Sequence, residues 1–172
     1  LWNEVADYID QAYDYDKIEK IYLSGDGAGW IKTGVGLINR STFVLDRYHL
    51  NKAVKVAGAH IENGERGLWR AIREEDKEYL KVVFDTILDG TESETKVEAV
   101  RKARTYIVNH WESLKYHYSE EYTGCSAEGH ISHIYSDRLS SRPLGWSRKG
   151  VDQMARLRVF TANGGSIYAI TL

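Results

Sequence analysis

The sequence of 172 residues contains one cysteine, one proline and one methionine, and its formal net charge is only −2. A single cysteine, Cys125, excludes an internal disulfide framework and suits a reducing cytoplasm. No apolar run reaches the roughly 18 residues that a membrane span requires, so no membrane partner is expected. The small net charge excludes a global attraction to nucleic acid, although a local basic surface stays possible.

The residues that are present suit one folded domain. Hydrophobic residues make up 42% of the sequence, with five tryptophans and twelve tyrosines, which argues against disorder. The charge is unevenly distributed: residues 1–20 carry six acids and two lysines, whereas residues 138–158 carry six basic residues and one acid. The basic stretch is either a surface that follows DNA phosphates or a solvated helix face.

The apolar pattern predicts an α/β chain that is mostly helical. Residues 1–14 have helical spacing, and residues 18–24 and 41–46 are short runs typical of strands. From about residue 47 to residue 118 the spacing is helical almost throughout, and this stretch has no proline. Because two strands do not make a stable sheet alone, further strands are expected before Leu1 or from another chain, unless none exist. The chain also opens without methionine, which suggests a fragment or a truncated reading frame.

The last third of the chain is also predicted to be helical. Ser126 is a suitable N-cap for a helix that runs through Leu139. Pro143 falls in a loop, and residues 151–160 are expected to begin another helix.

Three acidic residues carry the chemical signal. Asp26 lies among glycines in IYLSGDGAGWIK after the first predicted strand, Asp46 ends the second strand, and Glu128 lies near a predicted helix start. A carboxylate at the end of a strand faces the crevice where α/β sheets bind ligands. Such oxygen ligands suit Mg²⁺ in sites of phosphoryl transfer. For Asp26, the alternative is an ordinary Asp-Gly turn.

Asp46 and His49 form a D-x-x-H pair at the junction between strand and helix. Three residues apart on a first helical turn, their side chains can meet on one face. Asp46 either binds metal or caps the helix while His49 contacts phosphate, and an N-cap aspartate beside a packed histidine is the structural alternative. Tyr48 and Leu50 are expected in the core.

The other histidines give a weaker signal. Cys125, His130 and His133 suggest zinc, but structural zinc takes four ligands, and no second cysteine or paired histidine cluster lies nearby. Zinc is therefore disfavoured. The three remaining histidines are expected on helix surfaces or as hydrogen-bonded core residues: His60, His110 and His117.

The loop over residues 136–147 combines hydroxyls, two arginines and Trp146. Hydroxyl and guanidinium groups suit phosphate oxygens, and an exposed tryptophan can stack on a base. The alternative is a hydrogen-bonded loop with the tryptophan packed in the core. The candidate DNA-binding residues are Arg138, Arg142, Trp146, Arg148 and Lys149.

Taken together, GDGAGWIK, FVLDRYHLNK and GCSAEGHISHIYSDRLSSRPLGWSRKGVDQMARLR resemble the bacterial ISLre-type insertion-sequence transposases, relatives of the Mutator-like DDE transposases. The resemblance implies a partial RNase H-like fold with an all-α insertion before the last catalytic acid. It implies a core in residues 1–50, an insertion in 51–120, and the catalytic-acid helix with a basic segment in 121–172.

The resemblance also implies site residues. Asp26 and Glu128 correspond to the second and third metal-binding acids, for two Mg²⁺ (or Mn²⁺) ions in the intact enzyme. Asp46 and His49 match a signature that follows the second acid. The first acid is expected in an upstream strand, and nothing in residues 1–25 matches it. Tyr135 stands seven residues after Glu128, where a helper cation would otherwise be expected.

The expected function is Mg²⁺-dependent DNA cleavage and strand transfer at insertion-sequence ends, with DNA and further copies of the protein as partners in the nucleoid region of the cytoplasm. Without the first acid, this chain is expected to be inactive alone, so its status as an enzyme is left open. The alternatives are an RNase H-like nuclease, which hydrolyses without joining, and a non-catalytic DNA-binding relic.

Overall fold

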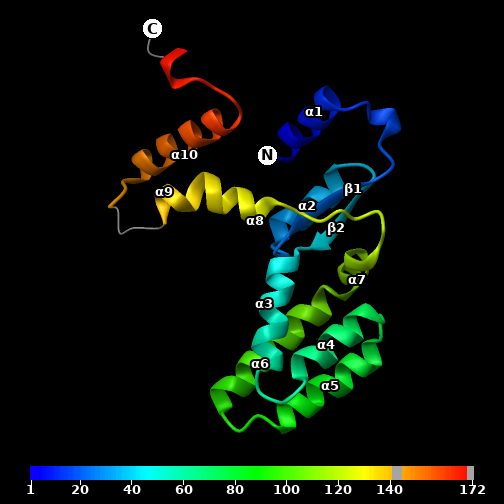
Figure 1. The fold of residues 1–172 in the computed structure, drawn as a ribbon. Coiled ribbons are helices and arrows are strands. Elements are labelled where there is room, and N and C mark those ends of the chain that lie inside the picture. The colour runs from blue at the N-terminus through cyan, green and yellow to red at the C-terminus, as the bar shows by residue number, and fades with distance from the viewer. Residues whose placement is uncertain (141–144, 170–172) are drawn as a thin grey trace. The chain divides into compact units, whose positions relative to one another are not determined.

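The computed structural model describes residues 1–140 and 145–169. The chain divides into two compact units, residues 1–125 and residues 126–172 (Figure 1). The first unit contains both described strands and most of the helices, and the second is helical.

The first unit begins with a helix and a short turn, and a β–α–β arrangement follows. Its elements are α1 (Trp2–Ala12), a 3-10 turn η1 (Tyr15–Lys17), β1 (Ile21–Gly25), α2 (Gly29–Leu37) and β2 (Ser41–Leu45). The two strands pair in parallel, from Ile21 opposite Ser41 to Gly25 opposite Leu45. The helix α2 is therefore the crossover that parallel neighbours require.

The first strand begins later than the predicted residues 18–24. The reason is the η1 turn, which ends when the backbone N–H of Ile18 donates to the carbonyl of Tyr15 at 3.2 Å. The pairing with the second strand starts only at Ile21, whose N–H donates to the carbonyl of Arg40 at 3.0 Å. Strand β2 lies within the predicted residues 41–46, with Asp46 just after it.

Between residues 47 and 118 the first unit is almost wholly helical, as predicted. Its elements are α3 (Arg47–Gly58), α4 (Gly64–Arg73), α5 (Lys77–Asp89), α6 (Glu94–Asn109), α7 (Trp111–Leu114) and a 3-10 turn η2 (Lys115–Tyr118). Figure 1 shows α3 to α6 gathered as a bundle beside the strands. Two of these helices start at aspartate caps, because the side chains of Asp46 and Asp76 each accept a backbone N–H from three residues further on.

One core joins the end of β2 to this bundle. Its largest fully buried side chains include Leu45, Leu50, Val54, Leu68, Ile72, Phe84, Ile87 and Ile107. Burial of each such side chain stabilises the fold by about 1.5–3 kcal/mol, so the carboxyl end of β2 is firmly fixed to the helices. Leu50 is buried as expected, but the prediction for Tyr48 is wrong: it is 57% exposed. The two residues differ by about 200° around α3, so only one of them can face the core.

The second unit contains α8 (Ala127–His130), a π-helical turn η3 (Ile131–Ser136), α9 (Asp137–Leu139), α10 (Arg148–Ala162) and a 3-10 turn η4 (Ile167–Ala169). The predicted helix through Leu139 is present, but its middle is widened into the π-helical turn. Ser126 occupies the N-cap position without a side-chain cap bond. Helix α10 begins before residue 151, because the hydroxyl of Ser147 accepts the N–H of Gly150 at 3.0 Å and caps it.

The fold is thus a mostly helical α/β arrangement with a two-stranded parallel sheet in the described residues. The RNase H-like fold stays a prediction. Within the described part of the chain, the helices are too short or too polar to cross a membrane.

Candidate active site

Asp26 and Asp46 follow the carboxyl ends of two neighbouring parallel strands. Gly25 and Leu45 are the last paired residues of β1 and β2. The pairing extends one step further, because the N–H of Asp46 donates to the carbonyl of Gly25 at 2.9 Å. Both aspartates therefore leave the sheet at the same edge, which is where α/β sheets bind ligands.

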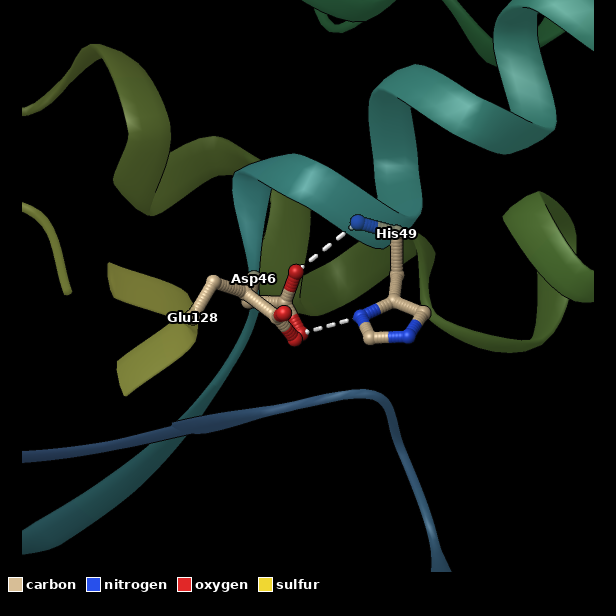
Figure 2. Close-up of side chains that lie close together, drawn as sticks. All are labelled: Asp46, His49 and Glu128. Carbon is tan, nitrogen blue, oxygen red and sulfur yellow. Dashed lines mark hydrogen bonds and ion pairs between the residues drawn. The ribbon is translucent and has the colours of Figure 1, made fainter. Parts of the chain in front are cut away.

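The carboxylate of Asp46 is buried and held at both oxygens by His49 (Figure 2). Its Oδ1 accepts the backbone N–H of His49 at 2.8 Å, and its Oδ2 lies 2.7 Å from the Nδ1 of the His49 ring. Asp46 thus caps α3, and capping was one of the two roles that the sequence suggested for it. Each carboxylate oxygen has a second lone pair, so capping leaves Asp46 able to bind a cation.

Asp26 is exposed and begins the turn into α2. Its Oδ1 accepts the N–H of Ala28 at 2.9 Å, which is an Asx turn. Gly27, between them, has a φ of 89°, a left-handed conformation that glycine adopts without strain. The turn interpretation of Asp26 is therefore present in the structure, and it fixes the direction in which the carboxylate leaves the strand.

Tyr106, on α6, connects the helical bundle to this turn, and no sequence pattern pointed to this residue. Its hydroxyl donates to the backbone carbonyl of Asp26 at 2.7 Å. Burial, followed by the negative charges of Asp46 and Asp26, raises the pKa of the Tyr106 phenol to about 12. Tyr106 is therefore a neutral donor at physiological pH, and it lies within electrostatic reach of both aspartates.

His110, one helical turn after Tyr106, packs beneath the same turn. Its Nδ1 lies 2.8 Å from the carbonyl of Tyr106 and must carry the proton, since a carbonyl only accepts. Its Nε2 is buried and has no hydrogen-bond partner among the described residues. A Cβ added to Gly27 would lie 2.2 Å from this Nε2, so the ring and the turn are in close contact. His110 is therefore a buried, hydrogen-bonded residue, as one of its two predicted settings required, although its Nε2 has no partner among the described residues.

His117, on η2, lies behind the end of β2. Burial is the main reason that its pKa is lowered from the ordinary value, and the positive charge of Arg47 lowers it further. A hydrogen bond to the backbone of Leu45 and the charge of Asp46 act in the opposite direction. Its Nε2 is also buried without a partner among the described residues. Helical spacing in the sequence could not reveal that His110 and His117 both pack close to this edge.

The remaining predicted acid, Glu128, belongs to the second unit. It is a half-buried residue in the first turn of α8 and is also labelled in Figure 2. Its convergence with Asp26 on one cation stays a prediction. His130 and His133 are exposed.

The predicted DNA-binding residues are spread over the second unit. Arg138, on α9, and Arg148 and Lys149, at the start of α10, are exposed. Trp146 is half-buried, and its Nε1 is buried without a partner among the described residues. Arg142 lies outside the described residues.

The last two basic residues of the stretch 138–158 bind to other groups of the second unit. Arg156 pairs with Asp152 at 2.9 Å on α10. Arg158 donates to the backbone carbonyls of His133 and Ile134 and so holds α10 against η3. The surface available for phosphates is therefore narrower than the sequence count suggests.

Comparison with known proteins identifies the family. The uncharacterised protein family UPF0236 matches residues 1–172. The UPF0236 protein TTE0610/TTE0881/TTE1053/TTE2432 of Caldanaerobacter subterraneus subsp. tengcongensis is 52% identical over 168 residues, which cover 97% of this chain and 36% of that protein. The UPF0236 protein in the vanSb 3′ region of Streptococcus gallolyticus is 22% identical over 173 residues, covering 95% of this chain and 38% of that protein.

The chain thus spans little more than a third of the length of these relatives. No solved structure matches it. The match over the whole sequence shows that the chain belongs to the uncharacterised protein family UPF0236.

Proposed function

We propose that this chain carries part of the catalytic centre of a DDE-type DNA transposase, which cuts DNA at the ends of an insertion sequence and joins those ends to a target. The observation that carries the proposal is the placement of Asp26 and Asp46 in register at the ends of β1 and β2. Tyr106 lies near both carboxylates: the pKa of its phenol is raised mainly by burial and further by the charges of Asp46 and Asp26.

The residues at this edge fit a hard divalent cation such as Mg²⁺. Such ions prefer carboxylate oxygens, and Asp26 offers an exposed carboxylate next to a glycine turn that lets a phosphate approach the backbone. When bound, the cation would activate water or a 3′-hydroxyl and neutralise the charge on the phosphate. The resemblance to ISLre-type transposases implies that Glu128 supplies a third carboxylate.

The surrounding residues would orient the ligands. His49 fixes the rotamer of Asp46 through the two contacts described above, and Tyr106 holds the backbone of Asp26. Hydrogen bonds of this kind commonly tune the ligands of metal sites. Exposed Arg138, Arg148 and Lys149 would contact DNA phosphates.

The name of one relative also supports the proposal. It joins four locus designations, TTE0610, TTE0881, TTE1053 and TTE2432. A protein encoded at several places in one genome is expected of a mobile element, since transposition multiplies the gene. By family membership, we extend that inference to the present chain.

A strand-transfer assay in a full-length family protein that carries this segment tests the proposal. Asp26→Ala and Glu128→Ala should abolish joining of element ends to target DNA, while DNA binding stays at the wild-type level. Wild-type turnover in both variants would reject the assignment. Cleavage without joining in the unmodified protein would instead favour the RNase H-like nuclease, and metal-independent, salt-sensitive binding without cleavage would favour the DNA-binding relic.

Asp46 needs a separate control, because its removal also destroys a helix cap. Asp76 provides one: its Oδ1 accepts the N–H of Tyr79 at 2.8 Å and caps α5 in the same way. Asp46→Ala and Asp76→Ala should both cost about 1 kcal/mol of stability. Only Asp46→Ala should lose strand transfer; equal activity in the two variants would assign Asp46 a capping role alone.

The 172-residue chain by itself should show little catalysis, because residues 1–25 contain no counterpart of the first acid. Robust Mg²⁺-dependent cleavage of terminal-repeat DNA by this chain would contradict the expectation.

A further inference from the structure

A groove runs between α3 and α6 and ends at Asp26. Helix α3 lines it with His49, Lys52, Ala53 and Val56, and helix α6 lines it with Ala99, Lys102, Ala103 and Tyr106. In both helices these positions are i, i+3, i+4 and i+7, so each set forms a single face. The groove has a volume of about 470 Å³, which lies within the usual range for small-molecule sites.

The alanines explain why a groove exists where two packed helices meet. Ala103 is almost fully buried, and Ala53 and Ala99 are half-buried, so they form a floor beneath the surface of the bundle. Longer side chains at these three positions would fill the space. The result is a largely apolar trough, with Tyr106 at the end nearest Asp26.

The charges along the groove favour an anionic occupant. Lys52 and Lys102 are exposed on opposite walls, and each directly precedes an alanine of the floor in the sequence. Lys102 pairs with Glu98 at 3.5 Å, but both side chains are well exposed, so the pair contributes little and can yield to a phosphate. Asp26 at the end of the groove would repel an anion unless a divalent cation is bound beside it. The groove therefore suits a ligand that has a flat apolar part, a negative charge and an affinity for the cation.

We propose that the α3–α6 groove binds one nucleotide of the DNA substrate, with its base on the alanine floor and a phosphate between Lys52 and Lys102. The inference rests on the proposed function, because the cation at Asp26 draws the neighbouring phosphate toward the catalytic edge. It adds a role for the helical segment, which would then take part in substrate binding as well as in folding.

Alanine methyl groups allow a direct test in the wild-type chain. The protein is labelled with ¹³C at alanine methyls and titrated with an oligothymidylate of about ten nucleotides, a length typical of single-strand sites, in the presence of Mg²⁺. The methyl signals of Ala53, Ala99 and Ala103 should shift, while that of Ala71, which is buried in α4, should not. A parallel titration with thymidine monophosphate separates binding of a DNA strand from binding of a free nucleotide. Tighter binding of the oligothymidylate than of the monophosphate supports a DNA strand as the ligand. Shifts confined to other alanines, or the same shifts with an acidic peptide, would overturn the inference.

Variants measure the contribution of each wall. Ala99→Leu fills the floor and should weaken oligonucleotide binding by about tenfold, whereas Ala59→Leu, at the exposed end of α3, should leave it unchanged.

The lysines of the two walls are tested separately. Lys52→Ala and Lys102→Ala should each weaken oligonucleotide binding by about tenfold, and Lys55→Ala and Lys81→Ala are the exposed controls. Equal affinity in groove and control variants, with unfolding transitions like that of wild type, would contradict the inference.

Failure of the groove and failure of the catalytic proposal are distinguishable. Mn²⁺ binding that Asp26→Asn and Asp46→Asn abolish, without any shift of the groove methyls on addition of nucleotide, would reject the groove and keep the catalytic site. Groove shifts in a chain that binds no Mn²⁺ at these aspartates would reject the metal site, and with it the link between groove and catalysis.

Discussion

The hydroxyl of Tyr106 donates a hydrogen bond of 2.7 Å to the backbone carbonyl of Asp26, and the two residues are 80 positions apart in the chain. This bond joins the end of the long helix α6 to the turn that follows β1. His110 packs under the same turn, so the helical segment supports the position of the candidate catalytic residue from two points.

Tyr106→Phe removes the hydrogen bond and keeps the ring. We expect a loss of about 1 kcal/mol in the free energy of unfolding, the usual contribution of one such bond, together with weaker Mn²⁺ binding at Asp26. Urea unfolding and a metal titration measure the two effects. Tyr48→Phe, at a tyrosine that is 57% exposed, is the control. A variant that loses stability but binds Mn²⁺ like wild type would show that Tyr106 has a structural role only.

Gly27→Ala should be among the most damaging small substitutions in the chain. The residue has a φ of 89°, and its new Cβ would lie 2.2 Å from the Nε2 of His110. Backbone strain and overpacking together should cost about 2–4 kcal/mol. The measurement is thermal or urea unfolding.

Gly29→Ala is the matched control for Gly27→Ala. It starts α2, has open space around it, and should be neutral or stabilising by up to about 1 kcal/mol. The double variant Gly27→Ala/His110→Ala separates the two causes of the loss. It should recover the stability that Gly27→Ala loses through overpacking and keep the loss that comes from the positive φ. No recovery would place the whole cost in the backbone.

The stability of the protein should fall in mildly acidic solution because of His117. Its folded pKa is lowered, so the unfolded state binds the proton more readily. The stability that the neutral ring contributes is complete above the unfolded pKa of about 6.5 and is lost as the pH falls through that value toward the folded pKa. His117→Asn should therefore show a smaller drop in unfolding free energy between neutral and mildly acidic pH. Parallel pH profiles for wild type and variant would contradict this prediction.

Magnesium should stabilise the 172-residue chain if Asp26 and Asp46 bind it. At a hundred times its dissociation constant, a ligand specific for the folded state adds about 2.7 kcal/mol. Thermal unfolding in MgCl₂, compared with NaCl of equal ionic strength, measures this effect. Asp26→Asn should remove it, whereas Asp10→Asn, on the exposed side of α1, should not. An equal shift in both variants would indicate nonspecific ion binding.

Much of the local structure could be read from residue order alone. The β-branched run that ends in Val44 and Leu45 indicated β2, and the spacing of Leu50 and Val54 indicated the buried face of α3. The position of Asp26 after a strand was also visible, because glycines on both sides mark the end of the run. Such features depend on neighbours within a few positions, and a sequence displays those directly.

The first strand shows where this local information ends. Residues 18–20 were predicted as the start of the first strand, but the side chain of Arg40 donates to the carbonyls of Tyr15 and Ile18 and stabilises the preceding turn instead. A contact between residues more than twenty positions apart thus decided where β1 begins.

The sequence by itself determined the helical character of the chain, its two short strands and the acidic residues that follow them, since periodicity and turn residues are local properties. Only the tertiary structure decided that Asp26 and Asp46 share one edge, that Tyr106 and His110 hold the turn between β1 and α2, and that α3 and α6 leave a groove beside it. These relationships depend on how the helices pack, and packing is fixed by the combined burial of many side chains, which no single stretch of residues specifies.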